Sequence, residues 1–79
     1  MKQPSLPDLS ARQLRAVLAL AENRSFIAAS VELKTSQPAL SRTIQQVERL
    51  LGMQLFNRTS RQVELTPAGR EFAALAGRM

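Results

Sequence analysis

The clearest hydrophobic pattern in this chain lies between Ser36 and Gly52. Its aliphatic residues recur at intervals of four, three and four positions, which aligns them on one face of an α-helix. They are Leu40, Ile44, Val47 and Leu51. Ser36 is a good N-cap, Pro38 suits the first helical turn, and Gly52 is typical of the residue after a helix. The pattern predicts a helix over residues 36–51.

The polar face of this predicted helix carries side chains suited to nucleic acid. It holds amides, a hydroxyl and guanidinium groups, which hydrogen-bond base edges and phosphates. They are Gln37, Ser41, Arg42, Gln45 and Arg49, with Glu48 among them. We therefore predict a DNA recognition helix. Glu48 is expected to pair within the helix or to support the edge of the core, not to act as a catalytic acid.

A first helix is predicted over residues 11–23. Ser10 and Gln13 have the spacing of a capping box at its start. The residues expected to face the core are Leu14, Val17, Leu18 and Ala21. The charged residues off this stripe are Arg12, Arg15 and Glu22, and we expect them to be solvated. Residues 1–9 contain two prolines and are expected to form an irregular arm.

A second, shorter helix is predicted over residues 26–33, with Ser25 as its N-cap. Its core-facing residues are expected to be Phe26, Ala29 and Leu33. Residues 28–30 are small, which allows another helix to approach closely. A turn at residues 34–35 then leads into the helix that starts after Ser36. Two helices joined by a tight turn, the second with a polar outer face, are typical of a helix-turn-helix.

The hydrophobic period changes after Gly52. Residues 55–58 and 62–65 are short segments, and in the second Val63 and Leu65 alternate with polar neighbours, which predicts a small β-hairpin, or wing. Arg58 and Arg61 are placed at or near its tip. Since a two-stranded ribbon is marginal by itself, we expect it to lean on the helices through Phe56, Val63 and Leu65.

A last helix is predicted to begin at Thr66 and Pro67, as cap and first helical residue. Its apolar stripe is Phe72, Leu75, Ala76 and Met79, and it reaches the final residue without a stop signal. These side chains are expected to pack either in the domain's own core or across a dimer. The predicted fold is mainly α: a winged helix-turn-helix of three helices and a small hairpin over residues 1–65, then a linker helix over residues 66–79.

Charge and composition narrow the classes of function. The 79 residues include 11 Lys and Arg and 6 Asp and Glu, a formal charge of +5, and most of the cations are Arg. Arg suits bidentate contacts with phosphate and guanine. With no His, no Cys and few acids, the sequence offers no nucleophile–base pair or metal cluster. We therefore expect neither an enzyme nor a cofactor. Neither a signal peptide nor a membrane-spanning run is evident, so a cytoplasmic location is expected.

These motifs resemble the N-terminal DNA-binding domain of LysR-type transcriptional regulators. The resemblance covers roughly residues 14–72, and its most specific parts are the run SQPALSR at 36–42 and the pattern LFxRxxR at 55–61. It implies a winged helix-turn-helix followed by a linker helix that pairs antiparallel in a homodimer. A separate C-terminal effector-binding domain normally follows and is absent from these 79 residues. A small-molecule effector would act only through that domain.

The motif and the helix geometry together assign candidate DNA contacts. They are Ser36, Gln37, Pro38, Ser41, Arg42 and Gln45 in the recognition helix, and Arg58 and Arg61 in the wing. Arg42 is placed for a guanine edge or a phosphate, and Gln37 for adenine. Arg61 would reach a minor groove, whereas Arg58 would support the wing or bind a phosphate. The candidate dimer residues are Phe72, Leu75 and Met79. For each polar residue, the alternative to a DNA contact is an ordinary solvent-exposed side chain.

The expected function is sequence-specific binding of double-stranded DNA in the bacterial cytoplasm, at the nucleoid. By analogy with the family, the target is an interrupted inverted repeat bound by a dimer. Two other classes stay open: a non-specific nucleic-acid or architectural binder, and a module that binds a protein or a membrane surface through the last helix. The weakly cationic face of that helix argues against the membrane.

Overall fold

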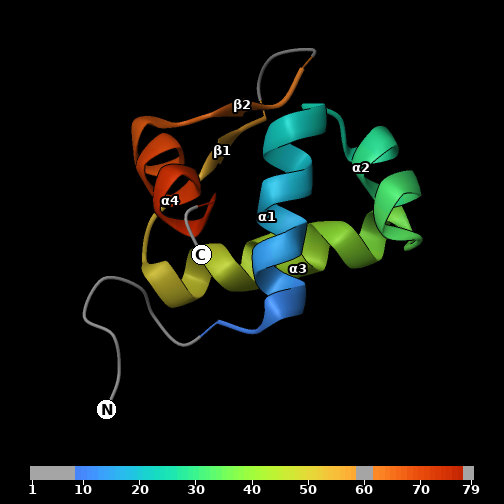
Figure 1. Cartoon of the computed structure of the whole chain (residues 1–79), viewed down its shortest axis with the longest axis horizontal. Helices are drawn as coiled ribbons and strands as arrows, with labels where there is room; N and C mark the ends of the chain where they lie inside the picture. Colours follow the sequence, from blue (N-terminus) through green and yellow to red (C-terminus); the bar gives the residue numbers. More distant parts are fainter. Residues whose placement is uncertain (1–8, 59–61, 78–79) are drawn as a thin grey trace.

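The computed structural model describes residues 9–58 and 62–77 (Figure 1). Its elements are α1 (Ala11–Asn23), α2 (Phe26–Leu33), α3 (Gln37–Leu51), β1 (Phe56–Asn57), β2 (Glu64–Leu65) and α4 (Pro67–Gly77). The predicted winged helix-turn-helix and the helix that follows it are thereby confirmed. The predicted arm at residues 1–8 lies outside the described residues, as do Arg61 and Met79. Within the described part, no helix is long and apolar enough to cross a membrane.

Serine N-caps set the starts of the first three helices, as predicted. The hydroxyl of Ser10 accepts the Gln13 backbone N–H at 3.1 Å, and the Gln13 side chain accepts the Ser10 N–H at 3.0 Å. The hydroxyls of Ser25 and Ser36 each accept an N–H at 3.2 Å, from the third residue of the following helix. These bonds satisfy donors that a helix leaves free at its start.

The same three helices end on residues in the left-handed backbone conformation. Gly52 ends α3 with φ of 70°, which glycine adopts without strain. Arg24 and Lys34 end α1 and α2 with φ of 57°, a conformation uncommon for residues that carry a Cβ. The turn between α2 and α3 is thus tight, and the Thr35 N–H donates to the Ser30 carbonyl at 2.9 Å.

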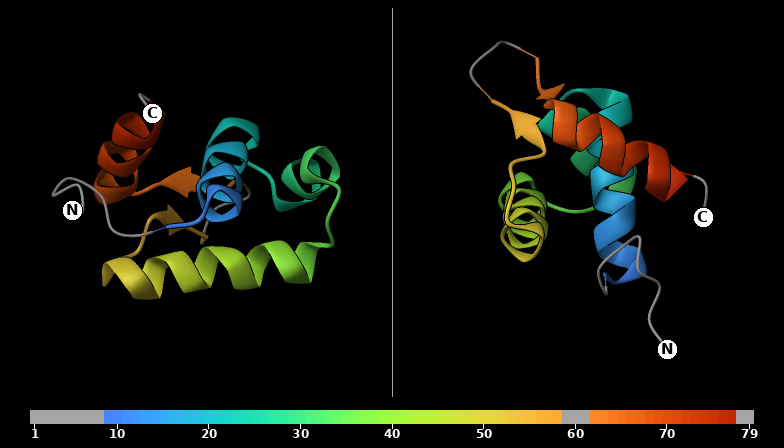
Figure 2. Two further views of the ribbon diagram at one scale, coloured as in Figure 1. Left: turned by 60° about the horizontal axis from the view of Figure 1, so that its bottom comes forward. Right: turned by 90° about the vertical axis from the view of Figure 1, so that its left-hand side faces the viewer.

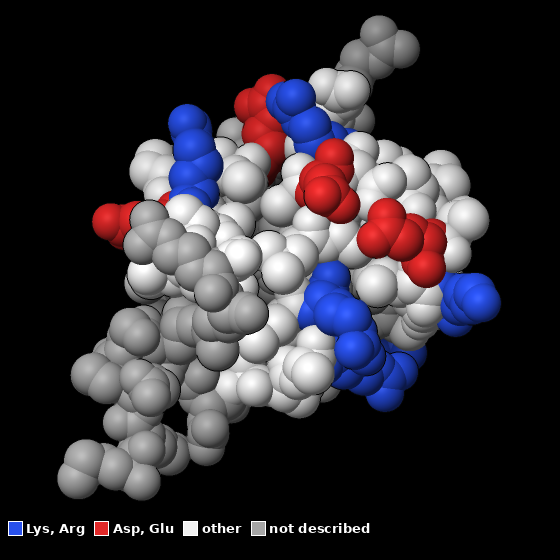
Figure 3. Space-filling view, viewed as in Figure 1, with Lys and Arg blue, Asp and Glu red and all other residues white. Residues whose placement is uncertain are grey.

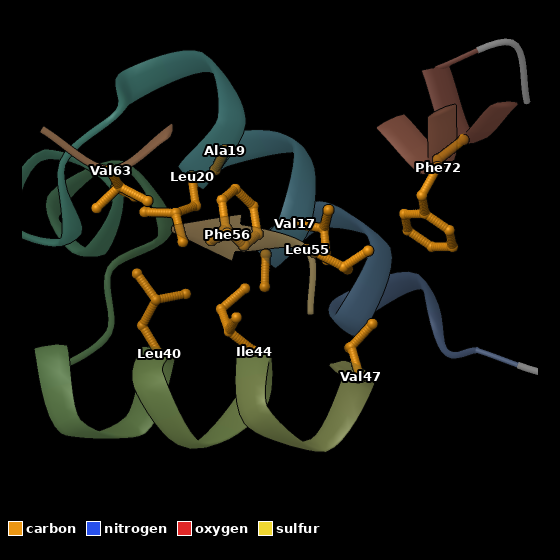
Figure 4. Packing of buried hydrophobic residues seen from close by; sticks show 13 residues of the cluster. Val17, Ala19, Leu20, Leu40, Ile44, Val47, Leu55, Phe56, Val63 and Phe72 are labelled. Carbon is orange, nitrogen blue, oxygen red and sulfur yellow. The ribbon is translucent and has the colours of Figure 1, made fainter. Parts of the chain in front are cut away.

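The core lies between α3 and the other elements. Leu40, Ile44 and Val47 point from α3 toward Leu20 of α1 and Phe56 of β1, and all five are almost completely buried (Figure 4). In the left panel of Figure 2, α3 lies along one side of the molecule and the other helices lie on the opposite side. One face of α3 is therefore buried along its length, while its outer face is free.

The predicted core face of α1 is confirmed but was incomplete. Val17 is buried, and Leu14, Leu18 and Ala21 are partly buried against the core. The prediction omitted Ala16, Ala19 and Leu20, which are also buried. The physical reason is that α1 contacts α2, α3 and α4, so it buries more than one stripe. The predicted exposure of the charged residues of α1 is confirmed.

The hairpin, which we call the wing (residues 56–65), packs on the helices as predicted. β1 and β2 are antiparallel, with Phe56 opposite Leu65. Phe56 and Val63 are buried, and the Val63 N–H donates to the Arg24 carbonyl at 3.1 Å. The wing is thereby tied to the end of α1.

Thr66 fixes the start of α4 against the loop that precedes the wing. Its N–H donates to the Leu55 carbonyl at 2.9 Å, and its hydroxyl donates to the Gln54 carbonyl at 2.7 Å. The same hydroxyl accepts the Gly69 N–H at 2.9 Å, which confirms the predicted cap. α4 approaches so closely that a Cβ on Gly69 would lie 2.1 Å from the Leu55 carbonyl oxygen.

Candidate nucleic-acid interface

The outer surface of α3, which we call the reading face, brings the predicted helix contacts together. Gln37, Pro38, Arg42 and Gln45 are exposed, and Ser41 is partly buried beside them. Among the described residues, the side chains of Gln37, Arg42 and Gln45 have no hydrogen-bond or ion-pair partner. Their donors and acceptors are therefore available to a ligand.

The start of α3 adds backbone donors to this face. Ser36 is exposed, and its hydroxyl and carbonyl already accept the N–H groups of Ala39 and Leu40. Since Pro38 has no N–H and those of Ala39 and Leu40 are bonded, the free backbone donor in the first turn is the Gln37 N–H, at the positive end of the helix dipole. Such a helix start favours an anion such as a phosphate.

Arg58 follows β1 in the wing, and its side chain reaches back to α3 and α2. Its Nη2 lies 3.2 Å from Oε1 of Glu48, and its guanidinium lies 5.8 Å from the centre of the Phe26 ring. Its side chain is 32% exposed. This is the wing-supporting role expected for Arg58, whereas its predicted contact with DNA stays a prediction.

Glu48 lies against the wing and not on the reading face. Its Oε2 accepts the backbone N–H groups of Leu55 at 2.8 Å and Phe56 at 3.2 Å. Only 12% of its side chain is exposed. Of the two expectations for Glu48, support of the core edge is confirmed. Its partners are Leu55 in the preceding loop and Phe56 and Arg58 in the wing, so the intrahelical pair is not the one observed.

Several cations gather beside α3, and the sequence did not predict this cluster. A hollow of about 200 Å³ between α1 and α3 is lined by Arg12, Arg15 and Lys34, and we call it the basic hollow. Arg12 also lines a neighbouring hollow together with Arg42. Figure 3 shows a group of basic side chains at the lower right of the molecule without acidic neighbours, whereas the basic side chains near the top lie beside acidic ones. The sequence did hold one indication of this cluster. Arg12 lies in the first turn of a helix, where the helix dipole disfavours a positive charge.

The three candidate dimer residues have different environments. Phe72 is 6% exposed and belongs to the chain's own core, one of the two environments expected for it. Leu75 is 38% exposed and lies on the surface of α4, whereas Met79 is outside the described residues. Of the two described residues, only Leu75 is available to a partner.

The described residues do not suggest a metal site, because no three acidic side chains gather among them. What they form is a capped helix with a free polar face, set in a helix-turn-helix beside a β-hairpin. This arrangement defines the class of winged helix-turn-helix domains.

The family follows from comparison with known sequences. Residues 11–70 match the model of the bacterial regulatory helix-turn-helix proteins of the LysR family. The chain belongs to the LysR family. It is 48% identical to the RuBisCO operon transcriptional regulator of Allochromatium vinosum over 63 residues, which are 80% of this chain and 21% of that protein. It is also 45% identical to a probable hydrogen peroxide-inducible genes activator of Streptomyces viridosporus over 75 residues, 95% of this chain and 22% of that protein.

Solved structures of LysR-type proteins share this fold. The BenM DNA-binding domain in complex with benA site 1 DNA is 43% identical, with a TM-score of 0.86 over 89% of this chain and 79% of that one. Vibrio fischeri DarR in complex with DNA is 33% identical, with a TM-score of 0.87 over 91% of this chain and 25% of that one. The chain thus spans about a fifth of the curated relatives and corresponds to their DNA-binding part.

Proposed function

We propose that this chain binds double-stranded DNA at specific sequences and serves as the DNA-binding domain of a transcriptional regulator. The observation that carries the proposal is the reading face, where polar side chains lie exposed and unpartnered on a rigid, capped helix. An α-helix fits the major groove of B-DNA, and the groove presents a different donor and acceptor pattern for each base pair. The DNA complexes of BenM and DarR support this assignment.

The residue roles in this proposal follow from position. Gln37 and Arg42 read base edges, and Pro38 packs against a thymine methyl group. Ser41 and Gln45 add hydrogen bonds to bases or phosphates, while Ser36 and the helix start hold a phosphate. The wing meets the adjacent minor groove, where Arg61 binds and Arg58 supports the wing or binds a phosphate.

The proposal extends to assembly. Two copies pair through α4, with Leu75 at the contact, and together bind an interrupted inverted repeat. A small-molecule effector acts through a separate domain of a longer protein, in keeping with the length of the relatives. Because its target is chromosomal DNA, the protein acts at the nucleoid in the bacterial cytoplasm.

The test begins by selecting duplexes from a random pool with the 79-residue chain. Fluorescence anisotropy then compares an enriched duplex with its scrambled counterpart across a salt series. We expect the enriched duplex to bind at least about 1000-fold more tightly at physiological salt. Equal affinity for both duplexes would contradict specific reading and support the non-specific binder, whose affinity is purely electrostatic. Absence of binding at low salt would contradict DNA binding altogether and favour an interaction module.

A further inference from the structure

The cations of the described residues divide into paired and unpaired groups. Arg24 pairs with Glu64 at 3.7 Å, and Arg58 pairs with Glu48 at 3.2 Å. Within the described part of the chain, the cations without an acidic partner are Arg12, Arg15, Lys34, Arg42, Arg49 and Arg70. All of these except Arg70 line hollows along α3. The positive charge that the fold leaves unneutralised is thus concentrated beside the reading face.

The basic hollow lies on a particular flank of α3. The right panel of Figure 2 shows α3 nearly end-on, with the hairpin on one side of it and the start of α1 on the other. Arg12 and Thr43 line both the basic hollow and the hollow that contains Arg42, so the two adjoin along the first half of α3. Among the residues that the structure describes, no carboxylate lines either hollow.

We propose that Arg12, Arg15 and Lys34 bind phosphates of the DNA backbone on the flank of α3 opposite the wing. The proposal rests on the proposed function, since the backbone reaches this flank only when α3 lies in the major groove. A helix about 10–12 Å wide fills that groove, so the protein beside it faces the phosphates that border the groove. The wing then covers one border and the start of α1 the other.

The chemistry of the hollow fits a phosphate. Two guanidinium groups offer forked donors that match phosphate oxygens, and the ammonium of Lys34 adds a point charge. Arg12 carries its charge in the first turn of α1, where the dipole disfavours a cation, and that turn contains no acidic residue. A phosphate bound in the basic hollow would offset this unfavourable placement of the Arg12 charge.

The test uses R12Q and R15Q, with R70Q as the matched control. Each variant removes one positive charge from an exposed, unpaired side chain, but Arg70 lies on α4 beside Glu64 and Leu65. Anisotropy is measured on the enriched and scrambled duplexes between about 50 and 200 mM salt. We expect R12Q and R15Q each to reduce the slope of log K against log salt by about 0.9, equally on both duplexes. R70Q is expected to keep the wild-type slope.

Two further measurements separate a phosphate contact from a structural defect. R15K keeps the charge and is expected to keep the slope. Neutral methylphosphonate linkages, placed one at a time in the enriched duplex, should weaken wild-type binding at the linkages bordering the groove and leave R15Q unaffected there.

R12Q and R15Q slopes equal to that of R70Q would overturn this inference. If the wild type still preferred the enriched duplex, the proposed function would stand and only the phosphate site would fail. A wild type that binds neither duplex would instead overturn the proposed function.

Discussion

The carboxylate of Glu48 in α3 lies 3.2 Å from the guanidinium of Arg58, the residue that follows β1 in the wing. Its other oxygen accepts the N–H groups of Leu55, just before β1, and of Phe56, the first residue of β1. One side chain therefore joins the recognition helix to the wing by three hydrogen bonds, two of them to the backbone. The placement of the wing relative to α3 therefore depends on this carboxylate.

Removal of the Glu48 carboxylate is expected to loosen the wing. Glu48→Ala leaves two partly buried N–H groups without an acceptor, and this should lower the free energy of unfolding by about 2–3 kcal/mol. Urea unfolding measures the change. Glu71→Ala is the control, because Glu71 is exposed on α4 and should cost less than about 0.5 kcal/mol. Equal losses in the two variants would show that Glu48 does not anchor the wing.

Gly69 permits the close contact between α4 and the loop before β1. A methyl group there would lie 2.1 Å from the Leu55 carbonyl oxygen, so α4 would have to move. We expect Gly69→Ala to destabilise the domain by about 3 kcal/mol, measured as a lower unfolding temperature. Gly77→Ala adds the same group where nothing lies within 4 Å and should not lower the stability. Similar unfolding temperatures for both variants would contradict the close packing.

Ser36 has a capping role and a proposed phosphate contact, and two substitutions separate them. Ser36→Ala removes the cap and should cost about 1 kcal/mol of stability. Ser36→Asp keeps a capping oxygen and favours the helix dipole, so its stability should match the wild type. Because the new carboxylate would face a phosphate, Ser36→Asp should nevertheless lose DNA affinity in anisotropy. If Ser36→Asp bound DNA as well as the wild type, the start of α3 would not lie near the backbone.

Leu75 is the described residue expected at the dimer contact. The chain contains no cysteine, so Leu75→Cys introduces a single thiol. Under mild oxidation on the enriched duplex, Leu75→Cys should give a covalent dimer on a non-reducing gel. Val31→Cys on α2 is the control: its site is 72% exposed against 38% for Leu75, yet it should stay monomeric. More cross-linking at Val31 would place the dimer contact elsewhere.

The helix boundaries were predictable because their signals are local. Each serine cap and Gly52 act within a few residues, and the predicted starts of α1, α2 and α3 agree with the structure. The buried face of α1 was less predictable, since Ala16 to Ala21 is apolar at every position and periodicity alone selects no single stripe. Contacts with α2, α3 and α4 decide which side chains are covered.

The parts of the site that escaped prediction depend on contacts between distant residues. Glu48 reaches the wing across a turn, and its spacing within α3 does not show whether it faces solvent or the loop. Arg15 and Lys34 are 19 positions apart, and only the packing of α1 against α3 brings them to one hollow. The reading face was predictable because all its residues lie on one helix.

The most direct test of the account is whether α3 reads bases through Arg42. Affinities of the wild type and Arg42→Ala are measured by anisotropy for every single-base substitution of the enriched duplex. We expect Arg42→Ala to lose about 1–3 kcal/mol of binding free energy and to lose discrimination at one base pair in each half-site, with the other positions unchanged. A uniform loss across all substitutions would place Arg42 on a phosphate. An affinity profile identical to that of the wild type would contradict the reading face.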